Sequence, residues 1–214
     1  MLDYASPFTF FFRDKAWLKK FVVASLLTYT VIGADPVSGW MVEVARRVGQ
    51  RESPELPEWE DWRSFWKEGT RFLGVNVLWL LPLVLAIISV YVPLLFVNRL
   101  SDITLLAVWG GTLFCVLIFV LLYSIIYLFF FPAMLVLLAK SGLTWASANP
   151  VRLWKIIRPR FMEYLLVFLI VGLGLFNVVL ILSAFTLFLL LPPLLVYLGV
   201  VTAHFAGQLS QGGY

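Results

Sequence analysis

Long apolar runs separated by short polar segments fill most of this chain of 214 residues. The runs 72–97, 103–139 and 164–206 each exceed the roughly 18 residues that mark a membrane-spanning helix. The third run is long enough to cross twice, with a division near Ser183. The pattern therefore predicts transmembrane helices at 73–97, 103–139, 164–182 and 184–206. The second of these is longer than a bilayer needs, so we expect it to tilt, protrude or break.

The first apolar segment, 17–46, is interrupted. Gly33, Asp35 and Pro36 lie in the interruption at 33–39, which is a strong turn signal. We expect a broken or re-entrant hairpin that enters the membrane and returns to the same side. The alternative is one long kinked helix with an external N-terminus. The aromatic residues before this segment predict that 1–16 lies at the membrane interface.

Two amphipathic helices are predicted in the polar connections, at 57–72 and 149–161. Pro57 and Pro150 suit a first helical turn, and Asn149 is a candidate N-cap. Each helix has aromatic residues at helical spacing opposite charged ones, which is typical of a helix lying in the interface plane. The candidate lipid-contacting side chains are Trp59, Trp62, Trp66, Arg71, Arg152, Trp154, Lys155 and Arg160. An anchoring role is the favoured interpretation over selective lipid recognition.

The composition supports a membrane location, with 62% hydrophobic and only 13% charged residues. A soluble domain carries roughly 25% charged residues. The predicted fold is an all-α, polytopic helical bundle of four to five spans in a single membrane domain, 1–214. Basic residues gather in 46–71 and 140–160, whereas the connection 98–102 carries only Arg99. The positive-inside rule then places both amphipathic helices and the C-terminus in the cytoplasm of a multi-pass cell (cytoplasmic or inner) membrane protein.

One stretch resembles a known family. Residues 56–62 read LPEWEDW, followed by Phe65, Gly69 and a span that contains Pro82. This LPEWxDW-type stretch is similar to the hallmark of a prokaryotic multi-helix membrane protein family known only as a domain of unknown function. The resemblance extends to the broken first segment and to the ending His204, Gly207, Gln208. It implies the fold and the membrane location, and it implies no mechanism.

Few residues offer chemistry. His204 is the sole histidine, and an imidazole could ligate haem, a pigment or a metal. The favoured interpretation is an interfacial polar residue or a cap, so we expect no metal and no cofactor other than bound lipid. Asp35 and Glu43 flank the broken segment, where we favour hydrated side chains. Asn76 and Asn177 lie within predicted spans and suit hydrogen bonds between helices.

No nucleotide-binding loop, nucleophile elbow, cysteine cluster or HExxH pattern occurs in the sequence. The single cysteine, Cys115, excludes an internal disulfide. Gly110, Gly111, Gly172 and Gly174 offer close-packing surfaces. We therefore predict a non-enzyme: an accessory or scaffold subunit of a larger membrane complex, such as a respiratory or photosynthetic one. Its expected partners are membrane lipids and other integral membrane subunits, not nucleic acid. The alternative is lipid or hydrophobic-molecule transport, or membrane shaping.

Overall fold

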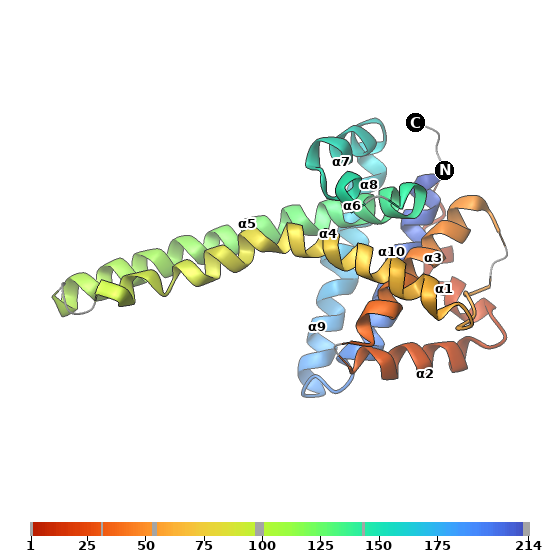
Figure 1. The fold of residues 1–214 in the computed structure, drawn as a ribbon, viewed down its shortest axis with the longest axis horizontal. Helices are drawn as coiled ribbons and strands as arrows, with labels where there is room; N and C mark the ends of the chain where they lie inside the picture. Colours follow the sequence, from red (N-terminus) through yellow and green to blue (C-terminus); the bar gives the residue numbers. More distant parts are fainter. Residues whose placement is uncertain (1, 31, 53–54, 97–100, 143, 212–214) are drawn as a thin grey trace. The chain divides into compact units, whose positions relative to one another are not determined.

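A computed structural model describes residues 2–30, 32–52, 55–96, 101–142 and 144–211. Residues 98–100 of the predicted connection 98–102, Arg99 among them, lie outside these residues. The described residues form helices and turns and contain no strand, which confirms the all-α prediction (Figure 1). The chain divides into two units, one formed by 1–75 with 129–214 and the other by 76–128. Helices α4 and α5 pass from one unit to the other.

The N-terminal segment packs against the end of the chain. Helix α1, Ser6–Phe10, leads into a 3₁₀ turn at Phe11–Arg13 and then into α2, Trp17–Thr28. Phe10 and Phe11 are buried, and α1 contacts α10, Leu191–Ser210. In the aromatic prefix that was predicted to lie at the interface, Phe10 and Phe11 therefore belong to the core, whereas Phe8 is half-buried and Tyr4 and Phe12 are exposed.

The break in the first segment falls earlier than predicted. Helix α2 ends at Thr28, and α3 runs from Ala34 to Gln50. Pro36 is therefore in the first turn of α3 rather than in the connection. Proline is well suited to that position, because its ring fixes a helical φ and the amide that it lacks would have had no helical partner there. With 12 residues, α2 is about 18 Å long, which is shorter than the ~30 Å hydrocarbon core.

The predicted helices 57–72 and 73–97 are largely one helix. Helix α4 runs continuously from Trp62 to Ser89 with Pro82 inside it, and a 3₁₀ turn follows at Val92–Phe96. Residues 57–61 precede the helix. No proline lies between Trp62 and Pro82, and glycine, here Gly69 and Gly74, is better tolerated in membrane helices than in soluble ones, as is proline.

Helix α5, Asp102–Ser141, passes through Gly110, Gly111 and Pro132 without a break. Its 40 residues extend about 60 Å, twice the hydrocarbon thickness of a bilayer. The helix is therefore longer than a bilayer needs, as predicted. It does not break into two shorter helices.

The C-terminal half begins with two short helices, α6, Thr144–Ala148, and α7, Pro150–Ile157. The side chain of Asn149 accepts hydrogen bonds from the amides of Val151 and Arg152, so the predicted N-cap is confirmed. A 3₁₀ turn at Arg158–Arg160 leads into α8, Phe161–Val167. A π-helical stretch, Phe168–Leu175, continues into α9, Phe176–Phe185.

The turn between the last two long helices lies after Ser183, not at it. Ser183 is buried inside α9, where its hydroxyl donates to the Val179 carbonyl four residues earlier. The connection consists of 186–190, in which Leu187 and Phe188 have φ values of 49° and 63°. Serine hydroxyls bond readily to the preceding helical turn, so the polar residue did not mark the helix end.

Helices α3 and α10 lie side by side and form the centre of the first unit (Figure 1). Gly199, Ala203 and Gly207 recur every four residues on α10. A Cβ placed on Gly207 would lie 2.5 Å from the Val48 Cβ and 2.7 Å from the Ala45 carbonyl oxygen. Small residues at this spacing allow two helix backbones to approach closely. Glycine is therefore required at 207 by the packing.

A second close approach joins α3 to α4. A Cβ on Gly39 would collide with the Phe65 carbonyl, and a Cβ on Gly69 would collide with the Asp35 carbonyl. The two glycines therefore allow contact between the two backbones, one from each helix. Helix α3 is confined in this way on two sides.

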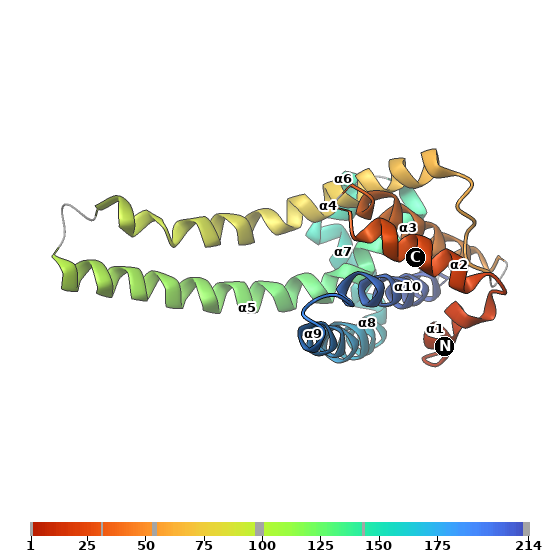
Figure 2. The same cartoon turned by 90° about the horizontal axis from the view of Figure 1, so that it is seen from below.

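The second unit, 76–128, is a helical hairpin whose arms run antiparallel (Figure 2). The Tyr123 hydroxyl donates to the Trp79 carbonyl at 2.8 Å, and the Tyr127 hydroxyl donates to the Asn76 side chain. Most of its apolar side chains are not covered by any other described part of the chain, including Leu85, Ile88, Leu106, Phe114 and Leu121. The hairpin therefore needs a lipid or protein environment outside itself.

Four helical stretches among the described residues are long and apolar enough to cross a membrane. They are Trp62–Ser89, Asp102–Ser141, Pro150–Phe185 and Leu191–Ser210. The protein is a multi-pass integral membrane protein.

The glycine contacts generate a paired prediction. Gly207→Ala forces a methyl group into Val48 and should destabilise the protein by about 2 kcal/mol, as overpacking does. Gly110→Ala meets no atom within 4 Å and should leave stability unchanged or slightly raised, because alanine is the better helix former. Thermal unfolding in detergent micelles measures both variants. Equal midpoints for the two would show that the α3–α10 contact is not tight.

Candidate functional site

The stretch 56–62 closes a buried polar cluster. The Lys20 Nζ donates to the Asp14 Oδ2 at 2.6 Å and to the Leu56 carbonyl at 2.7 Å, and it pairs with the Glu58 Oε1 at 2.6 Å. The Leu56 amide donates to the Asp14 Oδ2 at 3.0 Å. Lys20 is 2% exposed and Asp14 4% exposed. These residues, Asp14, Lys20, Leu56 and Glu58, form what we call the Lys20 clasp.

Both ions of the clasp are held in their charged forms. Burial opposes ionisation of Asp14, but hydrogen bonds from Lys20, Ala16 and Leu56 outweigh it and lower its pKa. Burial likewise disfavours the charged Lys20, but the carboxylates of Asp14 and Glu58 outweigh it and raise the pKa of the amine. The clasp is thus a charged link between the start of α2 and the segment before α4.

Tryptophans extend this link to α3. The ring of Trp59 stacks on that of Trp40 with centroids 5.2 Å apart, and the Trp59 indole donates to the Lys20 carbonyl at 3.3 Å. The Trp40 indole donates to the Pro57 carbonyl at 2.9 Å. Trp59, a candidate for lipid contact, is therefore half-buried within the protein, whereas Trp62 and Trp66 remain exposed.

A second ionic cluster joins α3, α4 and the end of α5. Glu68, only 8% exposed, pairs with Arg71 at 2.8 Å and with Arg46 at 3.6 Å. Arg46 also pairs with Glu43 and donates to the Ala139 carbonyl at 3.2 Å. Arg71 and Glu43 therefore take part in ion pairs within the fold.

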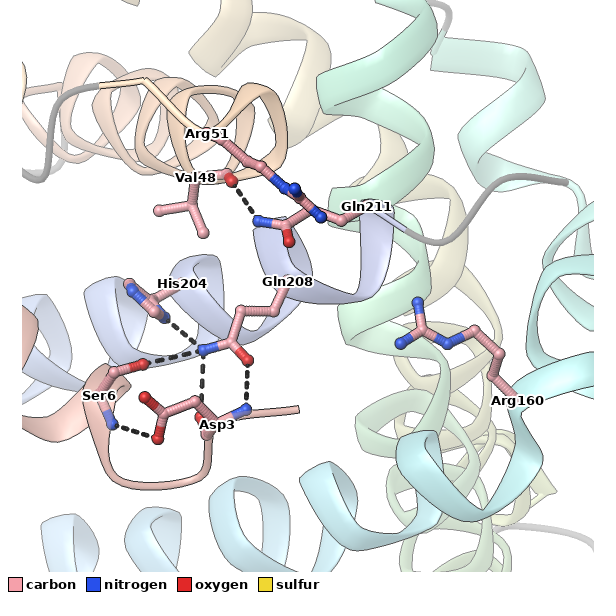
Figure 3. Close-up of a pocket in the computed structure, with 8 residues that line it drawn as sticks. All are labelled: Asp3, Ser6, Val48, Arg51, Arg160, His204, Gln208 and Gln211. Atoms are coloured by element: carbon pink, nitrogen blue, oxygen red, sulfur yellow. Dashed lines mark hydrogen bonds between the residues drawn. The ribbon is translucent and has the colours of Figure 1, made fainter. Parts of the chain in front are cut away.

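A polar pocket of about 430 Å³ lies where the N-terminal segment meets the ends of α3 and α10 (Figure 3). It is lined by Asp3, Ser6, Val48, Arg51, Arg160, His204, Gln208 and Gln211. The amide of Gln208 is its organising group. It accepts from the Asp3 amide at 2.8 Å, donates to the Asp3 carbonyl at 3.0 Å and lies 3.0 Å from the Ser6 hydroxyl. Its nitrogen is 3.2 Å from the His204 Nδ1.

Two arginines complete the polar pocket. Arg160 donates to the Leu209 carbonyl at 2.6 Å and pairs with Glu163. Arg51 is exposed and ends α3 in the left-handed conformation, with φ 57°. The Asp3 carboxylate caps the start of α1, where hydrogen bonds from the Ser6 and Ala5 amides lower its pKa. Two cations and several amide groups therefore surround one space.

The remaining candidate residues are dispersed. Arg152, Trp154 and Lys155 are exposed on α7. Asp35 accepts from the Thr70 hydroxyl at 2.9 Å, and the exposed Asn177 donates to the Leu173 carbonyl at 2.6 Å, one turn earlier in its own helix. Asn76 bonds to Tyr127 in the second unit. Asn76 therefore links two helices as predicted, whereas the hydrogen bond of Asn177 stays within its helix.

A separate apolar groove of about 350 Å³ runs between the N-terminal segment and the start of α10. It is lined by Phe11, Phe12, Trp17, Phe21, Leu190, Pro193, Leu194 and Tyr197. No polar surface contributes to this groove, which suits a hydrocarbon chain rather than a charged ligand.

A family model described as a protein of unknown function (DUF4013) matches residues 22–188. The chain belongs to the DUF4013 family. The match covers the Lys20 clasp residues Leu56 and Glu58 and the ionic cluster around Glu68. It ends before His204, so the polar pocket is only partly within the matched region. Searches of curated proteins and of solved structures found no match.

Within the described part of this DUF4013 chain, no group of three or more His, Cys, Asp or Glu side chains is placed to hold a metal ion. The His204 ring is 7% exposed and packs against Phe10 with centroids 4.6 Å apart. Its Nδ1 faces Gln208, which leaves the Nε2 as the nitrogen available to a ligand. Its observed partners are those of a structural histidine.

Sequence reasoning missed the clasp and the organising role of Gln208 in this DUF4013 protein. The sequence signal for the clasp was a lysine, Lys20, near the start of an apolar helix. In the structure, Ala24 and Ser25 are the other buried residues of that helix. Two of the partners of Gln208, Asp3 and Ser6, are about two hundred positions away, with no periodic pattern to connect them.

The clasp predicts a strong effect on stability. Lys20→Met leaves the buried Asp14 carboxylate without its cation and should destabilise this DUF4013 protein by about 3 kcal/mol. Asp14→Asn combined with Lys20→Met should recover part of that loss, because no buried charge is then left unpaired. Chemical unfolding in detergent micelles measures both variants. A double mutant less stable than Lys20→Met would contradict the pairing.

The pKa directions predict a pH window for the same contribution. Asp14 has a lowered pKa in the folded state, so its stabilisation is present above the unfolded value of 3.8 and is lost as pH falls through the lower folded value. Lys20 has a raised pKa, so its contribution is lost only as pH rises above 10.5. Thermal midpoints across acidic pH should therefore fall less steeply in Asp14→Asn than in the wild type. Parallel slopes would argue against this assignment.

Proposed function

We propose that this protein is a non-catalytic accessory or scaffold subunit that docks within a larger membrane complex through its hairpin, 76–128. The observation that supports the proposal is the exposure of the hairpin's apolar side chains. Within the described part of α5, buried residues occur only in Pro132–Ala139, outside the hairpin. A membrane subunit that binds neighbours needs such a surface.

One face of the α5 arm is suited to close contact with another helix. Gly110 and Gly111 have no atom within 4 Å of a Cβ placed on either of them. Glycine lowers helix stability by about 1 kcal/mol relative to alanine. The adjacent Gly110 and Gly111 therefore destabilise α5, and no packing contact within the described part of the chain offsets that loss. In membranes, glycines at helix surfaces allow partner backbones to approach. The occupant that we infer is an apolar helix of another integral membrane subunit.

Cys115 marks the same face. It lies four residues after Gly111, so the two share one side of the helix, and Cys115 is exposed. It is also the only cysteine in the sequence. A thiol-reactive cross-linker therefore reports on this face without any engineered substitution.

The test is gentle detergent extraction of the tagged protein from its native membrane, followed by mass spectrometry. Gly111→Leu should remove a stoichiometric partner by at least about tenfold, because the added side chain separates the helices. Leu85→Trp is the control, since it adds bulk at an exposed position of the same hairpin but on its other arm, α4. The control should retain the partner, and cross-linking from Cys115 should reach it.

Loss of the partner in both variants, or in neither, would place the contact elsewhere. Purification of the wild type alone, with only lipid bound, would overturn the subunit proposal.

The second candidate function is the handling of a lipid or another hydrophobic molecule. It is supported by the apolar groove, whose volume and lining suit an acyl chain. Under this alternative, Leu194→Trp should fill the groove and reduce bound lipid while the Gly111→Leu variant behaves as wild type. The two proposals are thus separated by which variant has an effect.

A further inference from the structure

The polar pocket is a ligand site that the docking role of the hairpin does not use. Its volume of about 430 Å³ falls within the range of small-molecule sites. It is assembled from four separate parts of the chain: the N-terminal segment, the end of α3, the turn Arg158–Arg160 and the end of α10. Figure 3 shows Arg51, Arg160 and Gln208 around the same space.

The hydrogen bonds around the pocket engage most of its amide groups and leave one guanidinium group available. The Oδ1 atom of Asp3 accepts from the Ala5 and Ser6 amides, and the Gln208 amide nitrogen is engaged by Asp3, Ser6 and His204. The Gln211 nitrogen donates to the Val48 carbonyl at 2.7 Å. The guanidinium of Arg51 has no such engagement among the described contacts, so all five of its N–H groups can serve a ligand.

The Arg160 side chain is held in place by hydrogen bonds, whereas no described contact holds the Arg51 guanidinium. Its hydrogen bond to the Leu209 carbonyl and its ion pair with Glu163 hold the side chain at the pocket wall. Its remaining N–H groups can join those of Arg51. Guanidinium groups match the geometry of phosphate oxygens, which they can bind through paired hydrogen bonds.

We propose that the polar pocket binds a phosphate group through Arg51 and Arg160, with Gln208 shaping its opposite wall. A phospholipid headgroup and a free phosphate share this chemistry. Arg51 is the ligand-contacting residue that can be varied most cleanly, whereas Arg160 also supports α10 and Gln208 also holds the N-terminal segment.

The test compares three probes on delipidated, full-length protein in neutral detergent by native mass spectrometry. Phosphatidylglycerol carries the phosphate, diacylglycerol has the same tails without it, and inorganic phosphate has no tails. We expect phosphatidylglycerol to bind at least about tenfold more tightly than diacylglycerol. Binding of inorganic phosphate as well would identify a site for free phosphate, and its failure to bind would identify a lipid site. Equal binding of the two lipids, with no binding of inorganic phosphate, would overturn the proposal.

Arg51→Gly separates binding from folding. Glycine relieves the left-handed backbone at φ 57°, so the variant should unfold at the same temperature as the wild type or a higher one. It should nevertheless lose the preference for phosphatidylglycerol by about tenfold. Arg63→Gln is the control, because it removes one exposed positive charge on α4 outside the pocket and should change that preference less than about twofold.

Equal effects of Arg51→Gly and Arg63→Gln would show that only general surface charge attracts the lipid, and the site would be rejected. Arg51→Lys should keep part of the preference, since it restores charge without the paired donors. Because none of these variants lies in the hairpin, partner binding should remain as in the wild type. Failure of this site would therefore leave the subunit proposal untouched.

Discussion

Close backbone contact on two sides of α3 is the constraint on which the first unit depends. Gly207 allows α10 to approach one side, and Gly39 with Gly69 allows α4 to approach another. The short separation brings the ends of these helices together, and the polar clusters form at those ends. The ion pair of Arg46 with Glu68 and the hydrogen bond from Gln211 to the Val48 carbonyl both require this approach. The glycines thus fix the geometry that the charged residues then use.

The membrane helices could be predicted because their signal is local. Runs of apolar residues longer than a bilayer needs, and the N-cap at Asn149, are properties of a single segment. The exact helix ends could not be predicted in the same way. Ser183 looked like a turn residue but bonds within its own helix, whereas the real turn at 186–190 is mostly apolar and contains two residues with positive φ. In a lipid-facing protein, hydrophobicity no longer distinguishes a turn from a helix.

The polar sites could not be predicted, because they depend on contacts between segments that are distant in the sequence. Trp59 was predicted as a lipid anchor from its spacing with Trp62 and Trp66, but its position against Trp40 and Lys20 depends on segments that no periodicity connects. Arg160 was identified as a basic interfacial residue, and its place in the polar pocket depends on α10 and the N-terminal segment. Spacing within a helix reveals which side chains share a face. It does not reveal what packs against that face.

The discontinuous first unit has a consequence for biosynthesis. Its residues up to 75 emerge from the ribosome before the hairpin, and α10 is translated long after α3. Until α10 arrives, Ala45 and Val48 on α3 have no glycine-lined neighbour, and Glu43 and Arg46 lie beside an incomplete core. The α3–α10 contact of the first unit can therefore form only after the hairpin has been translated. Contacts between segments far apart in the sequence also form slowly, so we expect this contact to be among the last to form.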